Sequence, residues 1–263
     1  MVTSSSRSAE DLAESLRDLH SRVYEFPAWE TLPHERLSPR SDTVAQRIAT
    51  LYALQLSDDI HPVVVAPVRA VIHRFIASLA TEPLWTLEIG QEIGLTELIT
   101  HLTELAFTRT DLVEKRGEFA VRGGIVDVFL PLAMHPVRID FFGDEIESVR
   151  SFDPLSQRTE QPIKGVVLGP VHEFVLTEAN IERFRTEYRE SFGRVKGEDP
   201  LYESVSAGRL YAGLDHWLPL LHEKMGLLTD YVEGAELIFE QEVVAAKEAR
   251  LETIRDFYTA RQS

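Results

Sequence analysis

Residues 117–153, GEFAVRGGIVDVFLPLAMHPVRIDFFGDEIESVRSFD, decide the fold of the middle of the chain. Successive side chains of a β-strand point to opposite faces of the sheet. In VRIDFF, residues 137–142, every second residue from Val137 is apolar, which predicts a face in the core. The opposite face carries Arg138, Asp140 and Phe142. Gly143-Asp144 then suits a hairpin turn, so the chain is expected to return as a second strand.

Phe142 is the unusual residue of this strand, because it shares a face with charged residues. An aromatic side chain next to an arginine outside the core is the composition of a protein-binding hot spot. Alternatively, Phe142 packs under a neighbouring helix or loop. Arg122 lies on the preceding predicted strand, before Gly123-Gly124. It either shares the face of Arg138 or is an ordinary surface arginine, since the sequence does not fix the strand register.

The pattern around this segment predicts a small α+β domain at residues 87–175. Apolar residues with helical spacing run from Leu95 to Leu105. From Leu112 to Phe174 the chain is β-rich, with glycine-containing turns between short apolar runs. A fragment of about residues 87–175 is therefore expected to fold alone.

The flanking segments predict a second, larger α/β domain that the small domain interrupts. Residues 63–68, VVVAPV, form a short β-branched run typical of a buried strand in a parallel sheet. Residues 68–79 are expected to be a helix. We assign residues 1–86 to the first part of this domain and residues 176–263, mostly helical, to the second part.

The composition limits the function classes. The 263 residues carry a formal net charge of −16, with 43 acidic and 27 basic side chains. Such a surface repels phosphate, so broad nucleic-acid binding is disfavoured. The chain has no cysteine, which excludes thiolate sites and disulfides. No apolar run approaches the ~20 residues of a membrane span, and the start has no secretory signal pattern. These features indicate a soluble, cytoplasmic protein without membrane contact.

Motifs of catalysis are also missing from the sequence. There is no GxxxxGK[ST] loop to hold nucleotide phosphates. Asp144-Glu145 resembles the acidic pair of a helicase, but its local pattern is a hairpin turn. His216, His222 and Glu223 lack the spacing of a zinc site. We therefore expect no catalytic residues, no cofactor and no metal.

Two long strings resemble a known family. GEFAVRGGIVDVF, followed by HPVRIDFFGDEIESVRSFDPLSQRT, is similar to the UvrA-binding domain shared by UvrB and the transcription-repair coupling factors. The early segment FPAWETLPHERLSP and residues 202–232 resemble the coupling factors in particular. The missing phosphate loop and the absence of a tyrosine cluster separate the chain from UvrB.

The resemblance implies a fold and a function. The larger domain would be an incomplete, degenerate helicase-like α/β domain with parallel strands, and MVTSS would be the end of its first strand. The protein would be a non-catalytic adaptor of transcription-coupled nucleotide-excision repair. Its partner UvrA would contact Arg122, Arg138 and Phe142. A full-length relative would also bind RNA polymerase and DNA, through C-terminal domains that this chain lacks.

Two other functions stay open on the sequence. The chain could be a DNA-binding fragment of a UvrB-like excision-repair helicase, whose binding would weaken steeply with salt. A stand-alone enzyme would show turnover, although no residue pattern predicts a substrate.

Overall fold

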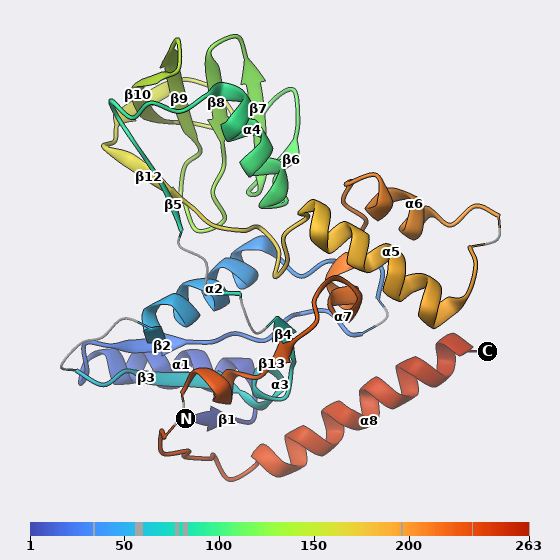
Figure 1. The fold of residues 1–263 in the computed structure, drawn as a ribbon. Helices are drawn as coiled ribbons and strands as arrows, with labels where there is room; N and C mark the ends of the chain where they lie inside the picture. The colour runs from blue at the N-terminus through green and yellow to red at the C-terminus, as the bar shows by residue number, and fades with distance from the viewer. Residues whose placement is uncertain are drawn as a thin grey trace. The chain divides into compact units, whose positions relative to one another are not determined.

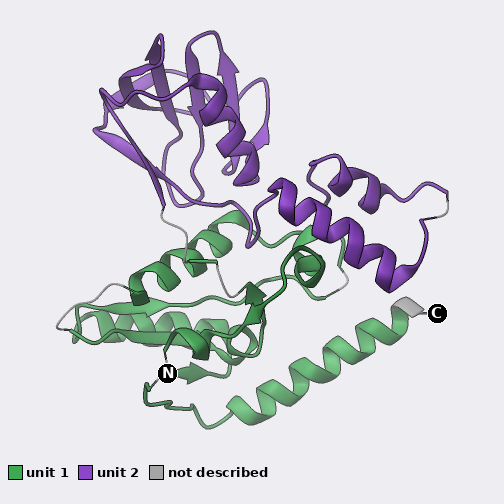
Figure 2. Ribbon diagram, viewed as in Figure 1, with its two compact units in different colours: residues 1–81, 212–263 green, residues 82–211 purple. Residues whose placement is uncertain are grey.

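The computed structural model describes residues 1–33, 35–55, 60–76, 79–80, 84–195, 197–232 and 234–262. The chain divides into two compact units (Figure 2). Unit 1 consists of Met1–Thr81 and Ala212–Ser263, and unit 2 of Glu82–Tyr211.

Unit 1 is built on a small parallel sheet (Figure 1). Strand β3 (Val63–Pro67) lies between β1 (Val2–Thr3) and β2 (Val23–Glu25), and both neighbours run parallel to it. The apolar run at residues 63–68 is therefore a central strand in a parallel sheet, as its composition predicts. MVTSS also contributes a strand, β1, as expected.

Helices cover and extend this sheet. Helix α1 (Ser6–Arg17) packs Ala9 and Ala13 against Val23 and Val65. Its small side chains allow the helix to lie close to the strands. The other elements of unit 1 are α2 (Ser41–Gln55), α3 (Val68–Val71), β4 (Phe75–Ile76), η1 (Leu214–Trp217), α7 (Leu218–Leu221), β13 (Met225–Gly226), η2 (Leu228–Tyr231) and α8 (Val243–Gln262).

The helix predicted at residues 68–79 is wrong over most of its length. Helix α3 ends at Val71, and Phe75–Ile76 form strand β4 instead. This strand pairs antiparallel with β13, whose residues lie about 150 positions later in the chain. A pairing so distant in sequence overrides the local helical pattern. Residues 77 and 78 lie outside the described residues.

Unit 2 contains a six-stranded sheet of order β11-β10-β9-β8-β7-β6. Its strands are β6 (Thr108–Arg109), β7 (Glu118–Arg122), β8 (Ile125–Val128), β9 (Val137–Phe142), β10 (Glu145–Phe152) and β11 (Thr159–Pro162). All neighbours are antiparallel except β6 and β7. Two-residue turns join β7 to β8 and β9 to β10, so the register next to each turn is fixed locally.

One face of this sheet forms the main core of unit 2. Helix α4 (Leu95–Glu104) places Leu98 and Leu102 against Val126 and Ile139. Strands β5 (Trp85–Glu88) and β12 (Gly165–Leu168) pair antiparallel and add to the same core. Apolar burial of this extent is the dominant stabilising term in a domain of this size.

The unit boundaries differ from the predicted ones. Helices α5 (Glu178–Phe192) and α6 (Pro200–Ser206) belong to unit 2, whereas we assigned residues 176–263 to the larger domain. The α5 segment is linked to unit 2 at its start, because the Leu176 amide donates to the Glu104 carbonyl at 3.1 Å. The composition predicts where the β-rich segment ends, but it does not predict which unit the following helices contact.

We expect residues 84–176 to fold without the rest of the chain. The buried core residues of the sheet domain run from Leu87 to Val171, and β5 begins at Trp85. The fragment therefore retains the whole apolar cluster. Circular dichroism should show one cooperative thermal transition. A fragment that melts without cooperativity, while the full chain melts cooperatively, would contradict this expectation.

Candidate protein-binding site

The alternation predicted for VRIDFF is confirmed. Val137 and Ile139 are buried, and Phe141 packs partly buried against the same cluster. Phe142 points to the other face and is 76% exposed. None of the helices and loops that the structure describes covers it, so the alternative in which Phe142 packs under a neighbouring element is wrong. The turn is also as predicted, because Phe142 pairs with Glu145 and Gly143 has a φ of 65°.

Arg122 and Arg138 meet on one carboxylate, that of Asp127. The register pairs Asp127 with Arg138 across β8 and β9. Arg138 donates through Nε at 2.7 Å to Oδ1 and through Nη2 at 2.9 Å to Oδ2. Arg122 donates through Nη2 to Oδ2 at 2.6 Å. Both arginines therefore lie on the same face of the sheet, and the buried Asp127 carboxylate binds both of them.

The three charged side chains differ in how far they are exposed to solvent. The side chain of Asp127 is 1% exposed, that of Arg138 15%, and that of Arg122 48%. A buried carboxylate is costly without charge-assisted hydrogen bonds. The Asp127 hydrogen bonds raise the pKa of the Arg138 guanidinium, which burial alone would lower. Arg138 is therefore largely an internal partner of Asp127, and Arg122 is the arginine with donors open to a ligand.

A small second core shields Asp127 on this polar face. Val113, Ala120, Phe129 and Phe152 form a buried cluster there. The Arg138 guanidinium lies 4.7 Å from the centre of the Phe152 ring, within the range of a cation–π interaction. The cluster keeps water from one side of the ion pairs, which strengthens them.

Another ion pair lies between the arginines and Phe142. Arg150 Nη2 and Ser148 Oγ both donate to Oδ2 of Asp140, at 2.5 and 2.7 Å. Burial raises the pKa of Asp140, but these hydrogen bonds outweigh it and hold the pKa below its usual value. By linkage, Asp140 stabilises the fold above the pKa of an unfolded Asp, about 4, and loses this effect as the pH falls through the depressed value.

Phe142 stands apart from the arginine pair along the strand. It is four residues from Arg138, roughly 13 Å at the rise of a β-strand. The surface that we call the arginine–phenylalanine face consists of Arg122, Asp127, Arg138, Asp140, Phe142 and Arg150. It offers half-exposed guanidinium donors at one end and an exposed ring at the other. This combination suits a protein surface with a carboxylate beside an apolar pocket.

Sequence reasoning missed Asp127 and Arg150. Asp127 interrupts the apolar string IVDVF, and a charge inside such a string requires a buried partner. That signal was available in the sequence. Arg150 pairs with Arg138 across β9 and β10, but a bulge near Ser148 shifts the register. The position of Arg150 could therefore not be counted from the turn alone.

The described residues contain no group of three or more His, Cys, Asp or Glu side chains that could hold a metal ion. Over the same residues, no helix is long and apolar enough to cross a membrane.

Residues 85–174 match the UvrB interaction domain. The chain is 38% identical over 277 aligned positions to the transcription-repair-coupling factor of Mycobacterium bovis, covering 99% of this chain and 22% of that protein. It is 33% identical to the factor of Haemophilus influenzae, and the match covers 92% of this chain and 21% of that protein. It is 35% identical to the factor of Escherichia coli, and the match covers 81% of this chain and 19% of that protein.

The matched residues include all six members of the arginine–phenylalanine face. The chain spans about a fifth of the length of these relatives. It is therefore similar to the N-terminal, UvrB-homologous region of the transcription-repair-coupling factors, with the UvrB interaction domain at residues 85–174.

Proposed function

We propose that this chain is a non-catalytic adaptor module that binds UvrA in transcription-coupled nucleotide-excision repair. The observation that carries the proposal is the exposed Phe142 on the same sheet face as two arginines held by a buried carboxylate, inside a segment that matches the UvrB interaction domain. The partner class is consistent with the name of that domain and with the coupling factors it matches. Its place of action is the cytoplasm, where DNA repair in bacteria takes place.

The geometry favours a protein partner over DNA. Arg122 and Arg138 are partly neutralised by Asp127, and Arg150 by Asp140. The chain as a whole carries a charge of −16. An acidic protein of this kind repels the phosphate backbone of DNA. A protein partner needs only one or two carboxylates and an apolar pocket to match the face.

Unit 1 would serve as a scaffold of the helicase-like type. Its parallel sheet with α1 following β1 is compatible with that origin. In a full-length relative, further domains would add the contacts with RNA polymerase and DNA. The module described here supplies the link to damage recognition.

The direct test is calorimetric titration of the full chain with purified UvrA. We expect saturable, equimolar binding that depends only moderately on salt, because apolar contact contributes alongside the ion pairs. A steep log-linear loss of affinity with salt for a DNA duplex, together with no UvrA binding, would instead support the DNA-binding alternative.

We also expect that the chain neither binds ATP with micromolar affinity nor hydrolyses it. A phosphate loop would supply backbone amides and a lysine to the nucleotide, and the sequence contains no such motif. Calorimetry with Mg-ATP and a phosphate-release assay check this. Hydrolysis that survives repurification and exceeds the buffer blank would contradict it.

A further inference from the structure

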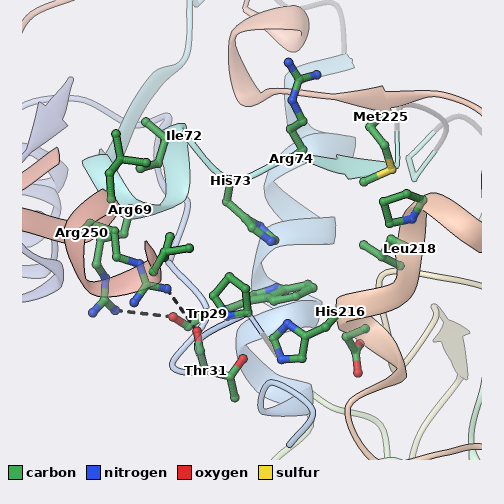
Figure 3. A pocket seen from close by; sticks show the side chains of 15 residues that line it. Trp29, Thr31, Arg69, Ile72, His73, Arg74, His216, Leu218, Met225 and Arg250 are labelled. Atoms are coloured by element: carbon green, nitrogen blue, oxygen red, sulfur yellow. Dashed lines mark hydrogen bonds between the residues drawn. The ribbon is translucent and has the colours of Figure 1, made fainter. Parts of the chain in front are cut away.

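A pocket in unit 1 has a chemistry that the repair function does not use. Its volume is about 340 Å³, within the usual range for small-molecule sites. Elements far apart in the chain form it: the loop around Trp29, the segment that follows β3, the η1–α7 region and helix α8 (Figure 3). Its wall is mainly apolar, with Ile72, Leu218 and Ile254 among the lining residues.

The charged lining of this pocket is basic, in contrast to the chain as a whole. Arg69, Arg74 and Arg250 line it, and Asp215, itself 1% exposed, is the acidic lining residue among the residues described. Figure 3 shows Arg69 and Arg250 side by side, whereas Arg74 points away from them. In a protein with 43 acidic and 27 basic residues, such a cluster gives the pocket a local preference for anions.

Arg69 and Arg250 are held close together mainly by backbone carbonyls. Arg250 Nη2 donates to the Thr31 carbonyl at 3.2 Å, and Arg69 Nη2 to the Trp29 carbonyl at 3.5 Å. Burial lowers the pKa of Arg250, and repulsion from Arg69 lowers it further. Glu35 acts in the opposite direction, but its carboxylate accepts the Leu32 amide at 2.9 Å. Among the described residues, neither guanidinium forms a salt bridge with a carboxylate.

Two buried polar atoms of the pocket lining have no hydrogen-bond partner among the described residues: Nε of Arg69 and Oγ1 of Thr31. Thr31 is only 8% exposed. Buried polar groups in native proteins are nearly always paired, so unpaired atoms at one pocket point to a missing ligand. Both a guanidinium and a hydroxyl can donate to an anion.

We propose that this pocket binds a small organic anion, with a carboxylate or phosphate head between Arg69 and Arg250 and an apolar body on the opposite wall. The planar guanidinium fork of arginine matches either head with paired hydrogen bonds. Thr31 supplies a further donor. Ile72, Leu218 and Ile254 contact the body. The lining residues belong to unit 1, whereas the arginine–phenylalanine face belongs to unit 2.

The test uses 2-naphthoate as the probe and 2-naphthamide as its uncharged match, titrated into the full chain by calorimetry. We expect naphthoate to bind with a Kd of about 1 mM or tighter, and the amide at least tenfold more weakly. Naphthyl phosphate is then compared with naphthoate, and the probe that binds more tightly identifies the head group that the pocket prefers. Naphthoate that binds no better than the amide would overturn the proposal.

Variants locate the site. Arg69→Gln and Arg250→Gln should each weaken naphthoate binding about tenfold or more, the usual loss for a charge-assisted hydrogen bond. Arg7→Gln is the matched control, because the Arg7 side chain is 89% exposed on α1; we expect it to bind like the unmodified chain. Ile254→Trp fills the pocket without a change of charge and should abolish binding even if the arginine variants fold poorly. Unchanged affinity in Ile254→Trp and in a folded arginine variant would place the probe elsewhere and overturn the assignment.

Discussion

Phe142→Ala is expected to lower the affinity for UvrA about thirtyfold, which corresponds to about 2 kcal/mol, the usual loss at an interface hot spot. The melting temperature should not change, because the ring is 76% exposed, and surface substitutions usually alter stability by no more than about 0.5 kcal/mol. Calorimetric titration with UvrA and a thermal melt measure the two effects separately.

Phe141 is the matched control for this substitution. It is the neighbouring residue with the same side chain, but it packs against the core on the opposite face. Phe141→Ala should lower the free energy of unfolding by about 2 kcal/mol or more, because it removes buried apolar area and leaves a cavity. If Phe142→Ala left UvrA affinity unchanged, the fold would stand and the proposed binding face would be wrong.

Arg138→Ala is expected to lower the free energy of unfolding by about 3 kcal/mol, because it removes one partner of a buried ion pair. Asp127, at 1% exposure, would lose two of its three arginine hydrogen bonds. Arg138, with a side chain 15% exposed, thus differs from a fully exposed arginine, whose replacement by alanine would leave folding nearly intact.

Arg122→Ala provides the comparison. The Arg122 side chain is 48% exposed, and Asp127 would keep both bonds from Arg138. Arg122→Ala should therefore lower the free energy of unfolding by less than about 1 kcal/mol, as for other exposed ion pairs. Urea unfolding of both variants measures the difference. A double variant, Arg138→Ala with Asp127→Ala, should regain part of the lost stability, because it leaves no unpaired buried carboxylate. Equal costs for the two single arginine variants would contradict the ordering.

Local patterns in the sequence determined much of unit 2. The period of two in VRIDFF was enough to place Phe141 on the core face and Phe142 on the opposite face, but only the structure shows that Phe142 is exposed. Gly143-Asp144 was enough to predict the turn. Both inferences succeeded because alternation depends only on neighbouring residues, and a hairpin turn joins strands that are adjacent in sequence. The run VVVAP in unit 1 likewise identified a central strand from its composition.

The tertiary structure decided the features that depend on distant residues. Strand β4 replaces most of a predicted helix because it pairs with residues 225–226. Helices α5 and α6 belong to unit 2 through contacts that composition does not reveal. Asp127 draws Arg122 and Arg138 together, and the pocket around Arg69 and Arg250 joins segments about 180 residues apart in the chain. Periodicity shows which face a side chain occupies, but the partner that neutralises its charge is fixed only when the chain has folded.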